Sequence, residues 1–258
     1  MPEPTEAGGW DRYLVEYHDT HPGITEDVVA GARDANGWSP YDWLVEAVPP
    51  GASTVVDVAC GSGPVARLLG QRRVVGVDQS TGELARARKS EPSGRLVRAG
   101  ATALPICDAA ADAVVMSMAL MLLRPLEAVL SEVRRVLRTG GTFTATVPLR
   151  QMAAAAGESH FAEILRALGQ SATDYPEPGD GLLADRFSTS GLTLGQDDVA
   201  SFSRDVCGPA DAELVVRSFY AANAATATVD AAVAAFQGRV RSGPVGVEYR
   251  IRRLVAIG

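Results

Sequence analysis

Two aspartates and two glycines have the types and the spacing of a ligand-binding site. Residues 55–64 read Val-Val-Asp-Val-Ala-Cys-Gly-Ser-Gly-Pro, an apolar run that passes through Gly61 and Gly63 into a predicted helix. Glycines let the backbone approach a ligand closely, and the N-terminus of the next helix offers unpaired N–H groups to an anionic group. Asp78 ends a second apolar run, 21 positions after Asp57. There a carboxylate can accept both hydroxyls of an adenosine ribose.

The elements that must position these residues alternate along the chain. Short β-branched or apolar runs predict strands at 54–59, 73–77, 95–99, 113–118 and 142–147, and helical patterns follow at 64–69, 81–89 and 125–137. Alternation at this spacing implies right-handed crossovers and a parallel sheet that is covered on both faces. The predicted fold class is therefore α/β.

The remaining segments predict helices around this core. Further helices are expected at 25–34, 40–48, 161–168, 182–190, 211–222 and 229–236, with strands at 192–206 and 246–257. Apolar and polar residues alternate in 246–257, which favours an edge strand. We expect a single domain over 1–258, with a cofactor-binding core over 51–150. An N-terminal cap over 1–50 would precede this core and contains an aromatic, polar stretch at 10–21. A helical insertion over 207–243 would act as a lid or a dimer face.

Residues 54–147 resemble the class I S-adenosylmethionine-dependent methyltransferases, particularly the small-molecule branch of the ubiquinone-biosynthesis, or methyltransferase-11-like, type. Asp57, Gly61 and Gly63 match that family's acidic-x-Gly-x-Gly-x-Gly pattern, in which Ala59 replaces the first glycine. The segments 101–105, with Asp108 and Asp112, and 137–141 are similar to two later family motifs: the stretch around the third loop and fourth strand, and the Leu-Arg-Pro-Gly-Gly turn. The resemblance implies a Rossmann-like, seven-stranded, mostly parallel sheet whose last strand is antiparallel.

The resemblance also implies roles for individual residues. The loop with Asp57, Ala59, Cys60, Gly61 and Gly63 would hold the methionine part of S-adenosylmethionine, Asp78 its ribose, and Gln79 would lie beside the adenine. Gly100 stands where relatives carry an acid that bonds the adenine, which leaves the N–H of Ala101 to reach the ring. Met116, Ser117 and Met118 would face the sulfonium, and Tyr13 and Tyr17 would close over the cofactor.

Histidine is the usual general base near neutral pH, which makes His18 and His160 candidate catalytic residues. Surface or structural histidines are the competing interpretation. Positioning and desolvation supply much of the rate of methyl transfer, and a base helps only if the acceptor carries a proton. Cys60, Cys107 and Cys207 are scattered, so no metal site is predicted.

The predicted activity is transfer of a methyl group from S-adenosylmethionine to an oxygen, nitrogen or carbon nucleophile of a small metabolite, in bacterial secondary metabolism. One alternative is a protein of the same fold with a non-methylating, cyclase-like or scaffold role. Another is an NAD(P)-dependent oxidoreductase, because residues 61–66 also fit a dinucleotide-binding pattern. Asp57 and the later motifs argue against the oxidoreductase.

The composition argues against nucleic acid and membrane as binding partners. A net charge of −7 argues against a nucleic-acid surface, because phosphate backbones are bound by clustered cations. No apolar stretch approaches the ~20 residues of a membrane span, and no secretory signal is visible. The expected protein is cytoplasmic, a monomer or homodimer, and binds neither nucleic acid nor membrane.

Overall fold

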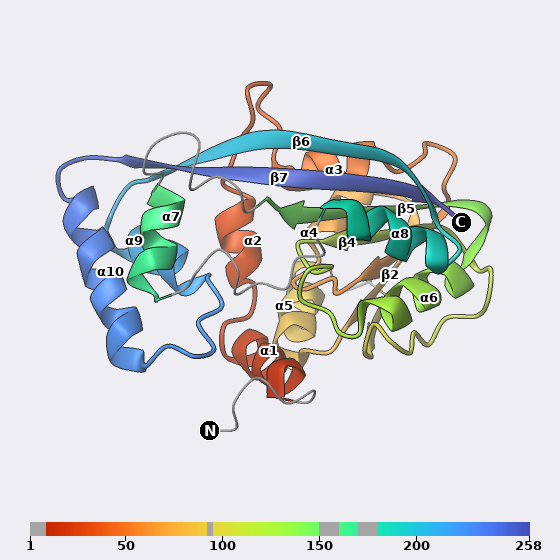
Figure 1. Ribbon diagram of the computed structural model, residues 1–258, viewed down its shortest axis with the longest axis horizontal. Coiled ribbons are helices and arrows are strands. Elements are labelled where there is room, and N and C mark those ends of the chain that lie inside the picture. Colours follow the sequence, from red (N-terminus) through yellow and green to blue (C-terminus); the bar gives the residue numbers. More distant parts are fainter. Residues whose placement is uncertain (1–8, 92–94, 150–159, 170–179) are drawn as a thin grey trace.

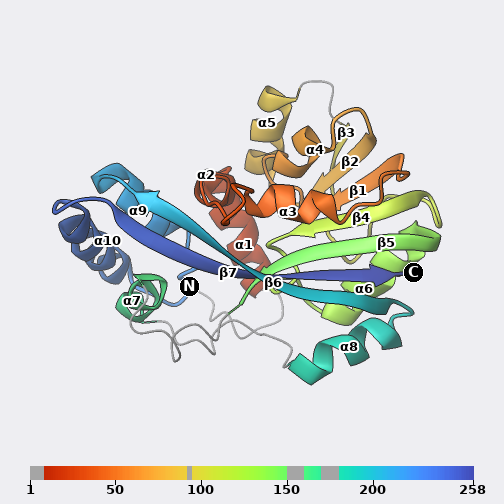
Figure 2. The same cartoon turned by 90° about the horizontal axis from the view of Figure 1, so that it is seen from above.

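The computed structural model describes residues 9–91, 95–149, 160–169 and 180–258. Its centre is a seven-stranded sheet in the order β3-β2-β1-β4-β5-β7-β6 (Figures 1 and 2). The strands are β1 Thr54–Val58, β2 Arg73–Asp78, β3 Arg95–Arg98, β4 Ala111–Ser117, β5 Leu137–Pro148, β6 Thr193–Val206 and β7 Val245–Ile257. β1 to β5 pair in parallel, whereas β7 is antiparallel to both β5 and β6. The predicted Rossmann-like fold is confirmed.

Helices cover both faces of the sheet (Figure 2). They are α1 Gly9–Thr20, α2 Ile24–Val29, α3 Pro40–Glu46, α4 Pro64–Leu69, α5 Thr81–Ser90, α6 Leu126–Val136, α7 His160–Ala167, α8 Asp180–Thr189, α9 Pro209–Arg217 and α10 Thr226–Val240. Apolar residues of α6 and α8 pack with Val56 and Val58 of β1, and those of α3 and α4 pack with Val55. Successive residues on a strand point to opposite faces, which explains why β1 is buried on both sides.

The hairpin of β6 and β7 extends beyond the parallel part of the sheet. Only Ile251–Ile257 of β7 pair with β5, whereas β6 continues to pair as far as Val245. Around this extension α7, α9 and α10 build a second apolar cluster that contains Ile164, Val215, Phe236 and Val247. Figure 2 shows these helices at the far end of the hairpin, away from α6 and α8. The segment 207–243, predicted as a helical insertion, therefore contributes to this second cluster.

The prediction of an edge strand for 246–257 is wrong. β7 lies between β5 and β6, and β6 forms the edge of the sheet. The alternation that suggested an edge arises because the first half of β7 has a neighbour only on its β6 side and is half-solvated there. The second half is continuously buried from Arg253 to Ala256, as expected for a central strand.

The N-terminal segment forms three helices. The aromatic, polar stretch at 10–21 is helical over α1, and the next predicted helix is shorter than expected, because α2 ends at Val29. Four residues later Arg33 exchanges backbone hydrogen bonds with Ser203 of β6 instead of continuing the helix. α3 begins with a capping box in which Ser39 and Asp42 bond each other's backbone N–H groups.

Candidate functional site

The glycine loop between β1 and α4 takes the backbone conformations that its sequence predicts. Gly61 and Gly63 have φ angles of 52° and 84°, in the left-handed region that favours glycine. Ala59 also has a positive φ, of 55°, although it carries a side chain. The turn therefore keeps the glycine-like conformation at the position where the family pattern has its first glycine.

Asp57 lies on β1 with its carboxyl group buried beside this loop. The residue is 1% exposed, and its Oδ2 atom has no hydrogen-bond partner among the described residues. Burial raises the pKa of Asp57 well above its ordinary value, and the neighbouring charge of Asp78 raises it further. A buried, unpartnered acceptor is costly, so the site suits a ligand that brings a donor or a positive charge.

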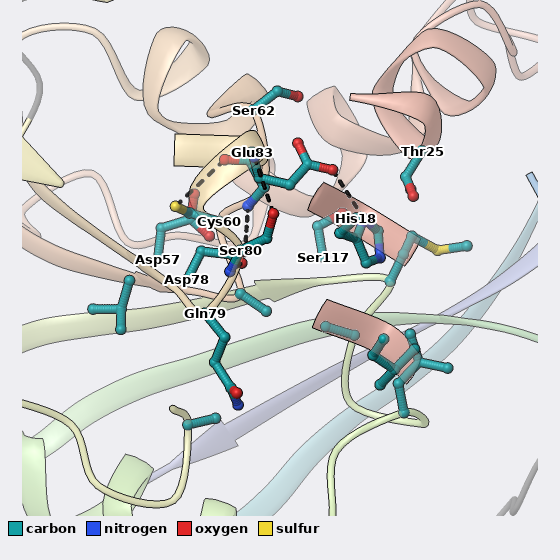
Figure 3. Close-up of a pocket in the computed structure, with 18 of the residues that line it drawn as sticks. His18, Thr25, Asp57, Cys60, Ser62, Asp78, Gln79, Ser80, Glu83 and Ser117 are labelled. Atoms are coloured by element: carbon teal, nitrogen blue, oxygen red, sulfur yellow. Dashed lines mark hydrogen bonds and ion pairs between the residues drawn. The ribbon is translucent and has the colours of Figure 1, made fainter. Parts of the chain in front are cut away.

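Asp78 is at the end of β2, and its carboxylate ties two segments together. Oδ2 accepts the N–H of Gly61 at 2.8 Å, and Oδ1 accepts the N–H of Ser80 at 2.8 Å. Burial raises the pKa of Asp78, while these backbone hydrogen bonds lower it. Because β1 and β2 are adjacent and parallel, the two aspartates lie at the same end of the sheet (Figure 3).

These residues line one cavity of about 990 Å³, counting its open mouth, which is large enough for a nucleotide-sized ligand. It lies at the carboxyl ends of the strands, where open α/β sheets bind ligands. The predicted site residues that line it are Asp57, Ala59, Cys60, Gly61, Asp78, Gln79, Ala101, Ser117 and Met118, together with the catalytic candidate His18.

Five predicted cofactor residues and one catalytic candidate do not line this cavity. Gly63 is the N-cap residue that precedes α4, and Gly100 lies behind Gln79, whose Nε2 would be 3.2 Å from a Cβ at Gly100. Met116 is 0% exposed and packs in the core, because its side chain points from β4 to the face opposite Ser117. Tyr17 donates to the carbonyl of Arg217, and the hydroxyl of Tyr13 accepts the N–H of Ala221.

The catalytic candidate His160 lies in α7 at the second apolar cluster. Its Nδ1 is 3.3 Å from Glu163, and its ring lies against Phe236. It does not line the cavity that contains Asp57 and Asp78. The structure therefore places the two catalytic candidates, His18 and His160, in different parts of the molecule.

His18 lies in a chain of hydrogen bonds at the cavity wall. Its Nδ1 is 2.9 Å from Glu83 Oε1, and its Nε2 is 3.0 Å from the hydroxyl of Tyr220. Glu83 is buried, and its other oxygen accepts the N–H of Gly23 at 2.9 Å. Figure 3 shows Glu83 and His18 facing each other. A buried carboxylate that accepts the Nδ1 proton leaves Nε2 as a proton acceptor.

α1 forms part of the cavity wall and contacts both the core and the insertion at 207–243. The indole of Trp10 donates to the carbonyl of Leu122, and Asp19 accepts from Ser80 and from the N–H of Gly82 at the start of α5. On the other side, the backbone N–H of Ala221 donates to Tyr13. α1 therefore joins the cofactor loop region to the segment that follows α9.

Sequence reasoning missed several residues of the cavity wall. These are Asp11, Leu14, Val15, Thr25, Glu26, Tyr41, Ser62, Ser80 and Glu83. The sequence did indicate a helix at α1, because Trp10, Tyr13 and Tyr17 recur at the spacing of one helix face. Nothing in the local sequence indicated that Glu83 would meet His18, 65 positions away.

Comparison with known proteins agrees with this geometry. Residues 56–145 match the family model described as "Methyltransferase domain". An uncharacterised methyltransferase of Synechocystis is 38% identical over 101 residues, which cover 38% of this chain and 47% of that protein. The demethylmenaquinone methyltransferase of Beutenbergia cavernae is 39% identical over 89 residues, which cover 34% and 37% of the two chains. The matched segments thus span less than half of either relative.

Solved structures share the fold over more of the chain. The 4+2 cyclase SpnF superposes with a TM-score of 0.62 at 18% identity and covers 95% of this chain and 94% of its own. A putative methyltransferase from Bacillus halodurans gives 0.58 at 15% identity, over 84% and 98%. Phosphoethanolamine N-methyltransferase 2 of Haemonchus contortus, in complex with phosphomonomethylethanolamine and S-adenosylhomocysteine, gives 0.58 at 16%, over 96% and 59%. At these identities the likeness concerns the fold.

The fold is the Rossmann-like α/β architecture that solved methyltransferase structures share. Within this chain, residues 56–145 match the methyltransferase-domain family model and are similar in sequence to the two methyltransferases named above.

Two further findings concern the described segments alone. None of their helices combines the length and apolarity that a membrane crossing requires. Within the same segments, no three His, Cys, Asp or Glu side chains are grouped so that they could hold a metal ion.

Proposed function

We propose that this chain is a cytoplasmic enzyme that transfers a methyl group from S-adenosylmethionine to an oxygen, nitrogen or carbon nucleophile of a small metabolite. One observation carries the proposal: the buried Oδ2 of Asp57 has no hydrogen-bond partner among the residues that the structure describes, and it lies at the same end of the sheet as Asp78. The cavity wall there is acidic, which suits a cofactor with an ammonium and a sulfonium group and does not suit nucleic acid.

The residues present fit the cofactor. Asp57 would accept a hydrogen bond from its ammonium group, and the remaining lone pairs of Asp78 would accept from the ribose hydroxyls. Gln79 and the N–H of Ala101 would lie beside the adenine, and Ser117 would lie near the sulfur. When bound, S-adenosylmethionine supplies a methyl group on a positively charged sulfur, and S-adenosylhomocysteine leaves with the electron pair of the broken carbon–sulfur bond.

For an acceptor with a hydroxyl group, the chain offers a route for the proton. The Tyr220 hydroxyl donates to His18 Nε2, so its oxygen can accept the acceptor's O–H. As the acceptor oxygen gains the methyl group, its proton moves to the Tyr220 oxygen and the original Tyr220 proton moves to His18. The resulting imidazolium is paired with Glu83, in the manner of a carboxylate that orients a histidine base.

Calorimetric titration with S-adenosylmethionine and with S-adenosylhomocysteine tests the cofactor. We expect micromolar binding of both. Asp78→Ala should weaken binding by about 1–3 kcal/mol, the usual cost of unmatched buried hydrogen-bond partners. Absence of binding by the folded wild-type protein would reject the proposal, and wild-type affinity in Asp78→Ala would remove Asp78 from the cofactor site.

A cofactor-binding protein without methyl transfer is the second candidate, because the fold is shared with a cyclase. Formation of S-adenosylhomocysteine separates the two. If the protein binds S-adenosylmethionine and a screen of hydroxyl-, amino- and activated-carbon-bearing metabolites yields S-adenosylhomocysteine, methyl transfer is established. Binding without product over the whole screen favours the cyclase-like or scaffold role.

A further inference from the structure

A second cavity adjoins the one that contains the aspartates. It encloses about 970 Å³, counting its mouth, and shares Thr25, Met118 and Tyr220 with the first cavity. Met118 follows Ser117 at the end of β4 and has a positive φ of 54°, a conformation that costs energy for a residue with a side chain. This strained residue stands at the junction of the two cavities.

The walls of the second cavity come from segments that are distant in sequence. They are α2, the first turns of α7, the end of β5, the turn after α9 and the middle of β7. Most of the side chains are apolar, and six of them are Val28, Val29, Phe161, Leu165, Phe219 and Ile251. Figure 1 shows both α2 and α7 below β7, and Val28 of α2 and Ile164 of α7 belong to the same apolar cluster.

Charged groups are sparse on this wall. Among the described lining residues only Glu248 and Arg250 are charged. They alternate with Tyr249 along β7 and therefore project from the opposite face of the strand. Tyr249 also lines the wall, and its hydroxyl oxygen is buried and has no hydrogen-bond partner in the described part of the chain. The charged groups that act on this hydroxyl, Arg204 and Asp211, do not line the cavity.

We propose that the second cavity binds the methyl acceptor and that this acceptor is an uncharged, largely apolar molecule. The assignment rests on the proposed function, because it takes the first cavity as the cofactor site. A buried carboxylate, phosphate or ammonium group would lose its hydration without a paired charge, which costs far more than apolar burial recovers. A molecule that fills the cavity with ring or chain carbons instead gains from every apolar wall.

Two probes of equal ring size test the charge selectivity. The protein, saturated with S-adenosylhomocysteine, is titrated by calorimetry with 2-naphthol, which is uncharged at neutral pH, and with 2-naphthoate, which is anionic. We expect 2-naphthol to bind at least about tenfold more tightly, a difference of about 1.4 kcal/mol. Equal affinity for the two probes, or no binding of 2-naphthol, would overturn the assignment.

Substitutions of Leu165 locate the binding. Leu165 is half-buried on α7 and lines the second cavity but not the first. Leu165→Trp should fill the space and weaken 2-naphthol binding at least about tenfold, whereas Leu68→Trp, at an exposed position of α4, should leave it unchanged. Leu165→Arg places a cation in the wall and should reverse the preference toward 2-naphthoate, a gain that misfolding cannot produce. Unchanged selectivity in Leu165→Arg would place the probe elsewhere.

Titration of the same variants with S-adenosylhomocysteine separates the two proposals. Every Leu165 and Leu68 variant should keep wild-type affinity for S-adenosylhomocysteine. If the wild-type protein fails to bind S-adenosylhomocysteine, the proposed function fails. If S-adenosylhomocysteine binds and the naphthalene probes show no preference, only the acceptor assignment fails.

Discussion

At the scale of single residues, the buried carboxyl group of Asp57 destabilises the ligand-free protein and provides an acceptor for a ligand. This carboxyl group is buried, and Oδ2 has no hydrogen-bond partner within the described part of the chain. A cationic ligand group would be favourable at this oxygen. Ala59 shows a related compromise, because it adopts a positive φ that glycine would adopt without strain. Energetically unfavourable groups of this kind gather at ligand sites, where binding compensates for them.

Asp57→Asn should stabilise the ligand-free protein and weaken cofactor binding. The folded-state pKa of Asp57 lies above its ordinary value of 3.8, so the folded protein holds that proton more tightly than the unfolded chain. Stability that depends on this group is therefore lost as pH rises above 3.8 toward the folded pKa. At neutral pH the variant should gain roughly 1–3 kcal/mol in the free energy of unfolding.

Urea denaturation of both proteins across the pH range measures this gain. The difference between variant and wild type should grow as pH rises from acid to neutral. Titration with S-adenosylmethionine should show at least about tenfold weaker binding to Asp57→Asn. A variant that is less stable than wild type at neutral pH would contradict the assigned environment of the carboxyl group.

The hydrogen-bond chain through His18 predicts its tautomer. With Glu83 accepting from Nδ1, neutral His18 should carry its proton on Nδ1, which nitrogen NMR of labelled histidine detects. Glu83→Gln can donate to Nδ1 instead and should move the proton to Nε2. The signals of His21 and His160 serve as internal controls.

With a hydroxyl acceptor, Glu83→Gln should lose about 10²-fold or more in kcat with a changed pH profile. An Nε2–H tautomer in the wild-type protein would exclude the route through Tyr220.

At the scale of elements, α1 is the connection on which the site depends. It is held to α5 through Asp19, to the core through Trp10, and to the insertion through Tyr13 and Tyr17. The aromatic rings of Trp10, Tyr13, Tyr17 and Tyr220 also contact one another. A change at one end of α1 is therefore expected to affect the contacts of His18 at the cavity.

Asp19→Ala should loosen α1 from the N-terminus of α5. The hydrogen bond from the Gly82 N–H is the main reason that the pKa of Asp19 lies below 3.8. A lowered pKa contributes stability above the unfolded-state value, and this contribution is lost as pH falls through the folded pKa. Because Asp19 is exposed, we expect a loss of only about 0.5–1 kcal/mol at neutral pH. Thermal melts should show the difference at neutral pH and its disappearance below pH 3.8; a constant difference would assign the effect to packing.

At the scale of the whole molecule, two apolar clusters share one sheet. The larger cluster lies around β4, β5 and α6, and the second lies under the extension of the β6–β7 hairpin. The cofactor cavity belongs to the parallel end, whereas the apolar cavity lies between the two clusters. Stability of the second cluster and affinity for the cofactor should therefore be separable.

Phe236→Ala tests this separation. Phe236 is 3% exposed in the second cluster, so its truncation should lower the free energy of unfolding by about 3–5 kcal/mol. Affinity for S-adenosylhomocysteine, measured at a temperature where the variant is folded, should change less than about twofold. A loss of cofactor binding in the folded variant would show that the two ends of the molecule are coupled.

The sequence by itself determined the alternation of strands and helices, the glycine turn, and the position of Asp57 and Asp78 at neighbouring strands. These features follow from periodicity and from the backbone freedom of a few residues, which are local properties. It also indicated the second group of helices at 211–222 and 229–236. The structure has them as α9 and α10, displaced by a few residues at their ends.

Only the tertiary structure decided how distant segments meet. His18 contacts Tyr220 across 202 positions, β7 inserts between β5 and β6, and Met116 turns into the core while Ser117 lines the cavity. Each outcome depends on which apolar faces pack together over long sequence separations. A local pattern shows that a face is apolar and leaves open what covers it, because burial is settled by the packing of the whole chain.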